Sequence, residues 1–202
     1  MSTPQLPVSN GWCPFAVKHL LPNHYGPGSG LVVRNTIVDH ATEGTTAAGA
    51  IATFENSVPP NRVSAHFVID RDGIITQLVS IHNTAFHASQ CNHYSVGIEH
   101  VALSLNGARA LNKQYAARIA AGKQTPWDYM PATDVQYASS ARLHKWICDT
   151  LGLLVDRNHI RTHNEASPRD GHVECCTGAV DIDRIVRMTQ DLIRPETEKA
   201  PT

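Results

Sequence analysis

Short runs of β-branched residues alternate along this chain with longer segments of helical periodicity, and this order restricts the fold. Two apolar runs, residues 63–70 and 74–80, flank Arg71-Asp72-Gly73, and Asp-Gly between two such runs predicts a β-hairpin. Further strands are expected at residues 31–39, 94–102 and 159–163. Because strands and helices intermix, the predicted fold class is α/β, with a mixed central β-sheet flanked by helices.

Capping residues and apolar spacing predict the helices between these strands. Thr45 is expected to cap a helix that runs to about Ser57. Asp134 is expected to cap a long helix that ends at Gly152, and Asp181 is expected to cap the last helix. A shorter helix is expected at residues 111–122 in a less regular region.

The length and composition indicate one globular domain. The chain has 202 residues, of which 42% are hydrophobic and 17% are charged. The predicted division is an extended N-terminal arm at residues 1–30, a domain at residues 31–195 and a polar tail at residues 196–202. The formal net charge of −1 offers no electrostatic support for binding to nucleic acid or to an anionic membrane surface.

The sequence predicts synthesis in the cytoplasm without a signal peptide. The N-terminus lacks both a basic start and an apolar core, and no apolar run is long enough to span a bilayer. The five cysteines are an odd number without the spacing of a disulfide framework. A reducing compartment, with a metal ligand among the cysteines, is the expectation that fits these features.

The segment from His159 to Asp183 places a histidine at the end of a predicted strand and a cysteine pair shortly before the last helix. Imidazole nitrogen and thiolate sulfur are ligands that suit zinc, and a site with three protein ligands leaves a fourth position for water. We therefore predict a Zn²⁺ site formed by His163, Cys176 and His40. Each of these residues taken alone is more often structural, so the prediction rests on their combination.

Glu99 is the acidic residue of a strand that otherwise has the composition of a buried one. A carboxylate that faces the interior is costly unless it has a partner or a function. At this point, a structural role and a functional role for Glu99 are equally open.

Together these segments resemble a family, the zinc-dependent N-acetylmuramoyl-L-alanine amidases of type 2, which include the peptidoglycan recognition proteins. The resemblance covers roughly residues 31–193 and depends on the order and spacing of several short motifs. In chain order, these are the strand ending at His40, Ser64-Ala65-His66-Phe67-Val68-Ile69-Asp70-Arg71-Asp72-Gly73, Phe86-His87-Ala88, residues 92–99, Thr162-His163-Asn164-Glu165, Cys176-Thr177-Gly178 and Asp181-Ile182-Asp183-Arg184-Ile185.

The resemblance implies a role for each matching position. His40, His163 and Cys176 match the zinc ligands, and Glu99 matches the acid that assists the attacking water. His87 and Asn92 match positions that line the cleft and contact the substrate.

Two positions depart from the family pattern. Thr177 follows the ligand cysteine where proline is usual, and Glu174 stands where many members have a lysine that stabilises the oxyanion. His172 is one candidate for the missing donor. Cys175, Asp170 and His172 remain alternatives for the third ligand.

The resemblance implies hydrolysis of the amide bond between N-acetylmuramic acid and L-alanine, with Glu99 passing a proton from water to the leaving amine. The expected partner is peptidoglycan or a soluble muropeptide, with no nucleic acid and no membrane span; the oligomeric state is not predicted. One alternative is a peptidoglycan-binding recognition module without catalysis. Another is an amide hydrolase that cleaves a different bond of the stem peptide.

Three biological settings fit a chain of this kind: a phage endolysin, a delivered cell-wall effector and a cytoplasmic enzyme that recycles muropeptides. The lysin or effector is the favoured expectation. Stem-peptide preference is not predicted.

Overall fold

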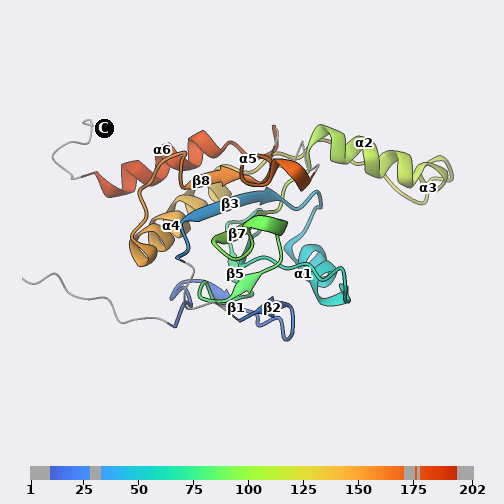
Figure 1. The fold of residues 1–202 in the computed structure, drawn as a ribbon. Helices are drawn as coiled ribbons and strands as arrows, with labels where there is room; N and C mark the ends of the chain where they lie inside the picture. Colours follow the sequence, from blue (N-terminus) through green and yellow to red (C-terminus); the bar gives the residue numbers. More distant parts are fainter. Residues whose placement is uncertain (1–9, 28–32, 171–175, 177, 195–202) are drawn as a thin grey trace, which may run out of the picture.

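A six-stranded mixed β-sheet forms the centre of the protein, and helices cover both of its faces (Figure 1). The computed structural model describes residues 10–27, 33–170, 176 and 178–194. The strands are β1 (Val17–Lys18), β2 (Tyr25–Gly26), β3 (Thr36–Ala41), β4 (Phe67–Ile69), β5 (Ile75–Gln77), β6 (Thr84–Ala85), β7 (Ser95–His100) and β8 (Ile160–Thr162). The α-helices are α1 (Ala47–Asn56), α2 (Leu105–Gln114), α3 (Ala116–Ala120), α4 (Asp134–Leu151), α5 (His163–Ala166) and α6 (Ile182–Ile193).

The strand order of the large sheet is β1-β5-β4-β7-β3-β8. Strands β4, β7, β3 and β8 run parallel to one another, whereas β5 is antiparallel to β4 and completes the predicted hairpin. The α/β class with a mixed sheet is thus confirmed. The parallel register pairs His40 of β3 with Glu99 of β7, so these two residues lie side by side on neighbouring strands.

The two faces of the sheet carry different apolar clusters. Helices α4 and α6 pack on one face, where Ile37, Phe67 and Ile98 lie in the same cluster as Leu143 and Ile185. Helix α1 lies on the other face, where its Phe54 joins a cluster that includes Val68 of β4 (Figure 1). Since successive residues of a strand point to opposite faces, β4 contributes Phe67 and Ile69 to the first cluster and Val68 to the second.

Capping explains where the long helices begin. Helix α4 ends at Gly152 as predicted, but the prediction that Asp134 caps its start is wrong by one residue. Thr133 is the N-cap and forms a reciprocal capping box with Gln136, and Asp134 is the first helical residue. Asp181 caps α6, also as predicted, by accepting a hydrogen bond from the backbone N–H of Arg184. The prediction for α1 is wrong by one residue, because the side chain of Thr46 rather than that of Thr45 caps the helix.

Two further boundaries differ from the prediction. The helix expected at residues 111–122 starts earlier, because Ser104 caps α2, and it is divided at Tyr115 into α2 and α3. The strand predicted at residues 159–163 ends at Thr162, whose side chain caps α5, so that His163 is the first helical residue.

Residues 10–27 contain two short strands, of which β1 joins the large sheet and β2 belongs to a separate two-stranded sheet. Strand β1 pairs with β5 at the edge of the large sheet, and β2 pairs with β6. The buried side chain of Gln77 accepts a hydrogen bond from the backbone N–H of Cys13 at 2.6 Å and donates to the carbonyl of Gly11 at 2.7 Å. These contacts attach the N-terminal segment to β5. The predicted boundaries at residues 30 and 195 stay predictions.

Across the part of the chain that the structure describes, no helix combines the length and apolarity required to cross a bilayer.

Candidate active site

The candidate site lies around the C-terminal end of β3, and His40 is at its centre. The rings of His87 and His163 both pack edge-on against the His40 ring, with centroid distances of 5.2 and 4.9 Å. Glu99 lies beside His40 in the register of β3 and β7. Residues from four separate parts of the chain therefore meet at one end of the parallel strands, where ligand sites of α/β proteins commonly form.

His163 is positioned by the start of α5. Thr162 and Glu165 form a capping box, in which the Thr162 backbone N–H donates to the Glu165 carboxylate at 2.8 Å. The His163 side chain is buried, and its Nε2 lies 3.1 Å from Oδ2 of Asp170. The structure therefore brings Asp170, one of the alternative third ligands, next to a predicted ligand.

His87 supports His40 through a chain of hydrogen bonds. The Ser95 hydroxyl donates to the carbonyl of Cys91 at 2.6 Å, so its oxygen accepts from Nε2–H of His87 at 3.2 Å. Nδ1 of a neutral His87 then accepts from Nε2–H of His40 at 3.0 Å. This arrangement assigns the proton of a neutral His40 to Nε2 and leaves a lone pair on Nδ1.

The neutral state of His87 agrees with its surroundings. Burial lowers the pKa of His87 well below its usual value, and the neighbouring His40 adds to this effect. Gly97 of β7 makes room for the ring, because a Cβ atom at this position would lie 2.5 Å from Cγ of His87. Only glycine lets the His87 ring lie so close to the sheet.

The loop that carries His87 is held by Asn92 and Arg34. Oδ1 of Asn92 accepts from the backbone N–H groups of His87 at 2.9 Å and Ala88 at 2.6 Å. The buried guanidinium of Arg34 donates to the carbonyls of Ser95 at 2.8 Å and of Asn83. The carbonyl oxygen of the Asn92 side chain thus has a structural role, and contact of His87 or Asn92 with a substrate stays a prediction.

Cys176 is buried beside β3. Its thiol donates to the carbonyl of Asp39 at 3.0 Å, one residue before His40. Cys176 has a φ of +74°, a backbone conformation that is uncommon for residues other than glycine. The alternative candidates Cys175 and His172, and Glu174 at the lysine position, lie outside the described residues.

A second group of polar side chains lies on the opposite face of β3, beneath α4. The Asp39 carboxylate is 3.1 Å from Nε2 of His144 and 3.8 Å from Nδ1 of His100, and the side chains of all three residues are fully buried. Ser140 lies 3.0 Å from Nε2 of His100 and 3.2 Å from Nδ1 of His144. We call this set of four residues the Asp39 network. Its polar atoms bond mainly to one another and to backbone.

The charge state of the Asp39 network follows from these contacts. Burial alone would raise the pKa of Asp39, but the adjacent His144 outweighs burial and lowers it. Conversely, burial alone would lower the pKa of His144, and the Asp39 carboxylate raises it. Burial lowers the pKa of His100. The network therefore holds one buried ion pair, Asp39 with His144, and a neutral His100.

The donor types of the candidate site fit zinc in part. Two imidazoles, a thiol and a carboxylate are chemically suitable ligands, and three of these four residues are buried within a few ångströms of β3. However, among the described residues no group of three or more His, Cys, Asp or Glu side chains is arranged to hold a metal ion. The ligand assignment therefore stays a prediction.

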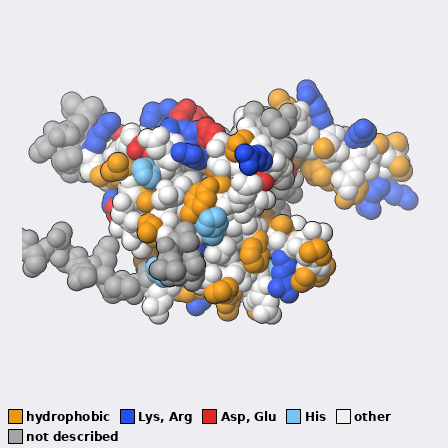
Figure 2. All heavy atoms as spheres, in the orientation of Figure 1, with side chains coloured by type: hydrophobic (Ala, Val, Ile, Leu, Met, Phe, Trp, Pro, Cys, Tyr) orange, Lys and Arg blue, Asp and Glu red, His pale blue; other side chains and the backbone are white. Residues whose placement is uncertain are grey.

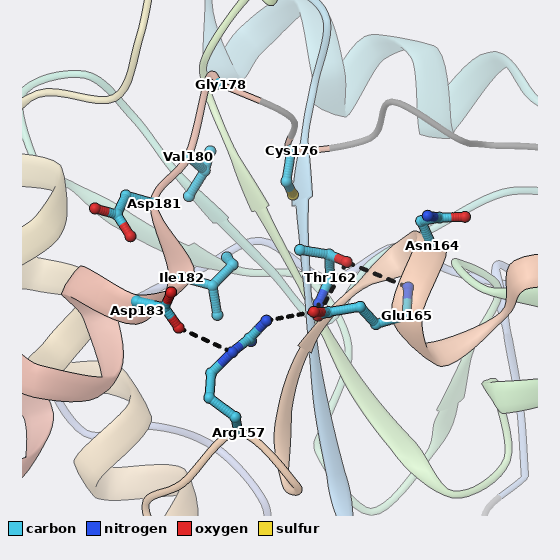
Figure 3. A pocket seen from close by; sticks show the side chains of 10 residues that line it. All are labelled: Arg157, Thr162, Asn164, Glu165, Cys176, Gly178, Val180, Asp181, Ile182 and Asp183. Carbon is cyan, nitrogen blue, oxygen red and sulfur yellow. Dashed lines mark hydrogen bonds and ion pairs between the residues drawn. The ribbon is translucent and has the colours of Figure 1, made fainter.

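A cavity of about 330 Å³ opens next to Cys176 (Figure 3). Arg157 reaches across one side of it and bridges two carboxylates, Glu165 at 2.5 Å and Asp183 at 3.1 Å. These ion pairs connect α5, which carries His163, to the start of α6. The other lining residues are Thr162, Asn164, Cys176, Gly178, Val180, Asp181 and Ile182.

The sequence predicted no role for His66, although it lies next to the site. Its Nδ1 accepts from the backbone N–H of Gly97 at 2.9 Å, its Nε2 donates to the carbonyl of Asn83 at 3.0 Å, and its ring is 5.8 Å from that of His87. Burial lowers the pKa of His66 to about 3, so it is neutral. The signal that could have identified it is a histidine directly before a continuous buried run.

Comparison with known proteins places the chain in a family. Residues 31–177 match the family described as N-acetylmuramoyl-L-alanine amidase. This chain therefore belongs to the N-acetylmuramoyl-L-alanine amidase family, and the resemblance to the type 2 amidases is confirmed.

A curated relative, "N-acetylmuramoyl-L-alanine amidase A" of Achromobacter lyticus, is 35% identical over 104 residues. That segment is 46% of this chain and 57% of the relative, so the chain matches little more than half of the relative's length.

Solved structures with low sequence identity share the fold. A crystal structure of an AmpD derivative has a TM-score of 0.65 at 22% identity, covering 91% of this chain and 99% of that chain. The endolysin amidase LysCS of Clostridium intestinale has a TM-score of 0.56 at 15% identity, covering 92% and 99%. At these identities, the similarity supports the fold alone.

Proposed function

We propose that this protein hydrolyses the amide bond between N-acetylmuramic acid and L-alanine in peptidoglycan, using zinc as a cofactor. The observation that carries the proposal is the position of Glu99, which lies beside His40 while His163 packs against the same imidazole. A carboxylate next to two imidazoles, at the C-terminal ends of parallel strands, is suited to proton transfer at a metal site. Membership of the amidase family supports this reaction rather than another hydrolysis.

The proposed zinc ligands are His40, His163 and Cys176, with Asp170 as the alternative to Cys176. Zinc, when bound, lowers the pKa of a water molecule towards ~7 and polarises the carbonyl of the scissile amide. The hydrogen bond from His40 to His87 favours Nδ1 as the ligand atom of His40. His163 would exchange its contact with Asp170 for the metal, or share the metal with Asp170.

Glu99 is the proposed catalytic acid and base. Its carboxylate accepts the proton of the attacking water and returns it to the nitrogen of L-alanine as the amide bond breaks. The products are a glycan freed of its stem peptide and a peptide with a free L-alanine amino group. His87 and Asn92 are proposed to lie close enough to contact the substrate, in addition to their structural hydrogen bonds.

The experiment that tests the reaction is digestion of purified sacculi followed by mass spectrometry of the products. We expect glycan without peptide, together with stem peptides that begin at L-alanine. Products cleaved within the stem peptide would instead identify a different amide hydrolase. Binding to sacculi without any product, with zinc present, would favour a recognition module.

The ligand set is tested by metal analysis of three variants. His40→Ala should abolish zinc binding in either assignment. Of Cys176→Ala and Asp170→Ala, only the variant that removes a true ligand should lose the metal. Full zinc occupancy in His40→Ala would contradict the proposed site.

We propose further that the protein acts on the cell wall as a phage lysin or a delivered effector. The similarity in fold to an endolysin is consistent with this setting. The alternative is recycling of soluble muropeptides. Comparing turnover on intact sacculi with turnover on soluble fragments separates the two, because a recycling enzyme should act on the fragments alone.

A further inference from the structure

A helical arm projects from the domain beside the candidate site. The arm comprises residues 104–129 and contains α2 and α3, which extend away from the sheet beyond the C-terminal end of β3 (Figure 1). Its base is closed where Leu103 and Met130 exchange two backbone hydrogen bonds of 2.8 and 2.9 Å. The chain thus leaves the domain at one point and returns at the same point.

The arm is held together by contacts of its own. The side chain of Asn112 accepts from the backbone N–H of Trp127 at 2.8 Å and donates to the carbonyl of Trp127 at 2.8 Å. The rings of Tyr115 and Trp127 pack at a centroid distance of 5.2 Å. These contacts attach the returning segment to the two helices, so the arm presents its outer side chains from a folded support.

The charge of the arm is opposite to that of the rest of the chain. It holds four of the 17 basic residues and one of the 18 acidic residues, which gives the arm +3 and leaves −4 on the remainder. The basic residues are all exposed: Arg109, Lys113, Arg118 and Lys123. Figure 2 shows Lys and Arg side chains along both visible edges of the arm. The overall charge of −1 conceals this separation.

The cations of the arm also differ from those of α6. On α6 and at its C-cap, Arg184, Arg187 and Arg194 each pair with a carboxylate of the protein. Within the described residues, no ion pair engages the cations of the arm, and Arg109 donates only to the Asn106 side chain. The arm therefore presents positive charge that no carboxylate of the described residues pairs with.

The base of the arm lies next to the loop that follows His40. Oε2 of Glu43 accepts from the backbone N–H of Ser104 at 3.1 Å and from its hydroxyl at 3.0 Å, at the start of α2. The Glu43 carboxylate also packs against Gly107 of α2, where a Cβ atom would displace it. A ligand that follows the arm towards its base thus arrives within three residues of His40.

We propose that the arm binds the carboxylates of polymeric peptidoglycan and guides a glycan strand, with its stem peptides, towards the site. This inference rests on the proposed function and adds to it a preference for polymer over soluble fragments. Stem peptides carry free carboxylates repeated along each strand, which complements cations spread over two helices. Individual exposed ion pairs are weak, but several acting on one polymer add their contributions.

The test measures binding to purified, protein-free sacculi by co-sedimentation at low temperature. Replacing all four cations by Gln should raise the apparent Kd about tenfold at low salt, and the difference should shrink as salt screens the charges. Amidating the carboxylates of the sacculi should weaken binding of the unmodified protein to a similar extent. Equal binding by the protein and its fourfold variant would overturn the proposal.

A matched pair of double variants separates the arm from net charge. Lys113→Gln with Arg118→Gln alters the arm, whereas Arg187→Gln with Arg194→Gln makes the same change in charge on α6. The arm pair should weaken binding to sacculi and the α6 pair should not; equal losses in both pairs would contradict a role for the arm. Binding of a DNA or RNA oligonucleotide through the arm as tightly as sacculi would assign the arm to nucleic acid instead.

Failure of the arm proposal can be distinguished from failure of the proposed function. Hydrolysis of a soluble muropeptide should be unchanged in the arm variants, because these residues lie outside the site. If the arm variants hydrolyse the muropeptide normally and bind sacculi as tightly as the unmodified protein, only the arm proposal is rejected. Arm-dependent binding to sacculi without hydrolysis of any substrate rejects the amidase assignment alone.

Discussion

The two faces of β3 carry two histidine clusters with opposite properties. On the α4 face, the Asp39 network consists of fully buried side chains that hydrogen-bond to one another and to backbone. On the other face, the rings of His87 and His163 pack edge-on against His40, which also hydrogen-bonds to His87, and Glu99 lies on the neighbouring strand. The difference teaches that a group of histidines does not by itself define a site. Both clusters combine imidazoles with a carboxylate, but the Asp39 network is sealed beneath α4 and its groups pair with one another, whereas the His40 cluster lies at the C-terminal end of β3.

The largest expected effect is on catalysis. Glu99→Gln keeps the size of the side chain and removes its ability to accept a proton, so turnover in a dye-release assay should fall ~10²- to 10⁴-fold. Zinc content and melting temperature should stay unchanged. Glu55→Gln, at an exposed carboxylate of α1, is the control and should retain full activity. Undiminished turnover in Glu99→Gln would place the chemistry elsewhere.

The second largest expected effect is a loss of folding stability when the Asp39 network is disrupted. Asp39→Ala leaves His144 buried without its counter-ion, and breaking a buried ion pair costs ~3–5 kcal/mol of the free energy of unfolding. Urea denaturation measures this loss. Asp149→Ala breaks the exposed pair with Lys145 and should cost less than ~1 kcal/mol. A similar loss of unfolding free energy in both variants would mean that the buried Asp39 network stabilises the fold no more than an exposed ion pair does.

A smaller loss of stability is expected when bulk is added at Gly97 of β7, next to the candidate site. Gly97→Ala introduces a Cβ atom against the His87 ring, and overpacking of this kind costs ~1–3 kcal/mol. Because His87 supports His40, zinc affinity should fall as well, which a competition titration with a chelating dye can measure. Ser95→Ala removes the partner of His87 without adding bulk and should reduce zinc affinity less. Unchanged zinc affinity in Gly97→Ala would show that the position of His87 does not affect zinc binding by His40.

The smallest expected effect is on the pH dependence of the free energy of unfolding. The pKa of His66 is about 3 in the folded protein, against 6.5 for an unperturbed histidine, so the unfolded chain binds more protons between these values. The contribution of neutral His66 to stability is complete above pH ~6.5 and decreases as the pH falls, by ~1.4 kcal/mol per pH unit. His66→Gln can keep both hydrogen bonds without titrating. Its free energy of unfolding, measured with a chelator present, should therefore fall less steeply from pH 7 to pH 5.

Local patterns in the sequence predicted several elements because their causes are local. The Asp-Gly turn between two apolar runs predicted the hairpin of β4 and β5, and Asp181 predicted the start of α6. Where two neighbouring residues competed for the same cap, as Thr45 and Thr46 did, the sequence alone chose wrongly. His163 was placed at the end of a strand, yet the capping box of Thr162 and Glu165 makes it the first residue of a helix.

The candidate site could be predicted residue by residue but not as an arrangement. The motifs around His40, Glu99 and His163 are recognisable in the sequence because each lies on a short, regular segment. The support of His40 by His87, Ser95 and Gly97 depends on a loop folding back over β7, for which the sequence offers no local signal.

By itself, the sequence determined the α/β class, the family and the residue types available for chemistry, since these follow from periodicity, turn formers and motif order. Only the tertiary structure decided which histidines are structural and which lie together at the site. The order β4-β7-β3-β8 arises from pairing between distant segments, and the alternation of side chains along β3 sends Asp39 into the interior and His40 to the site. One residue of register therefore separates a buried ion pair from the proposed catalytic centre.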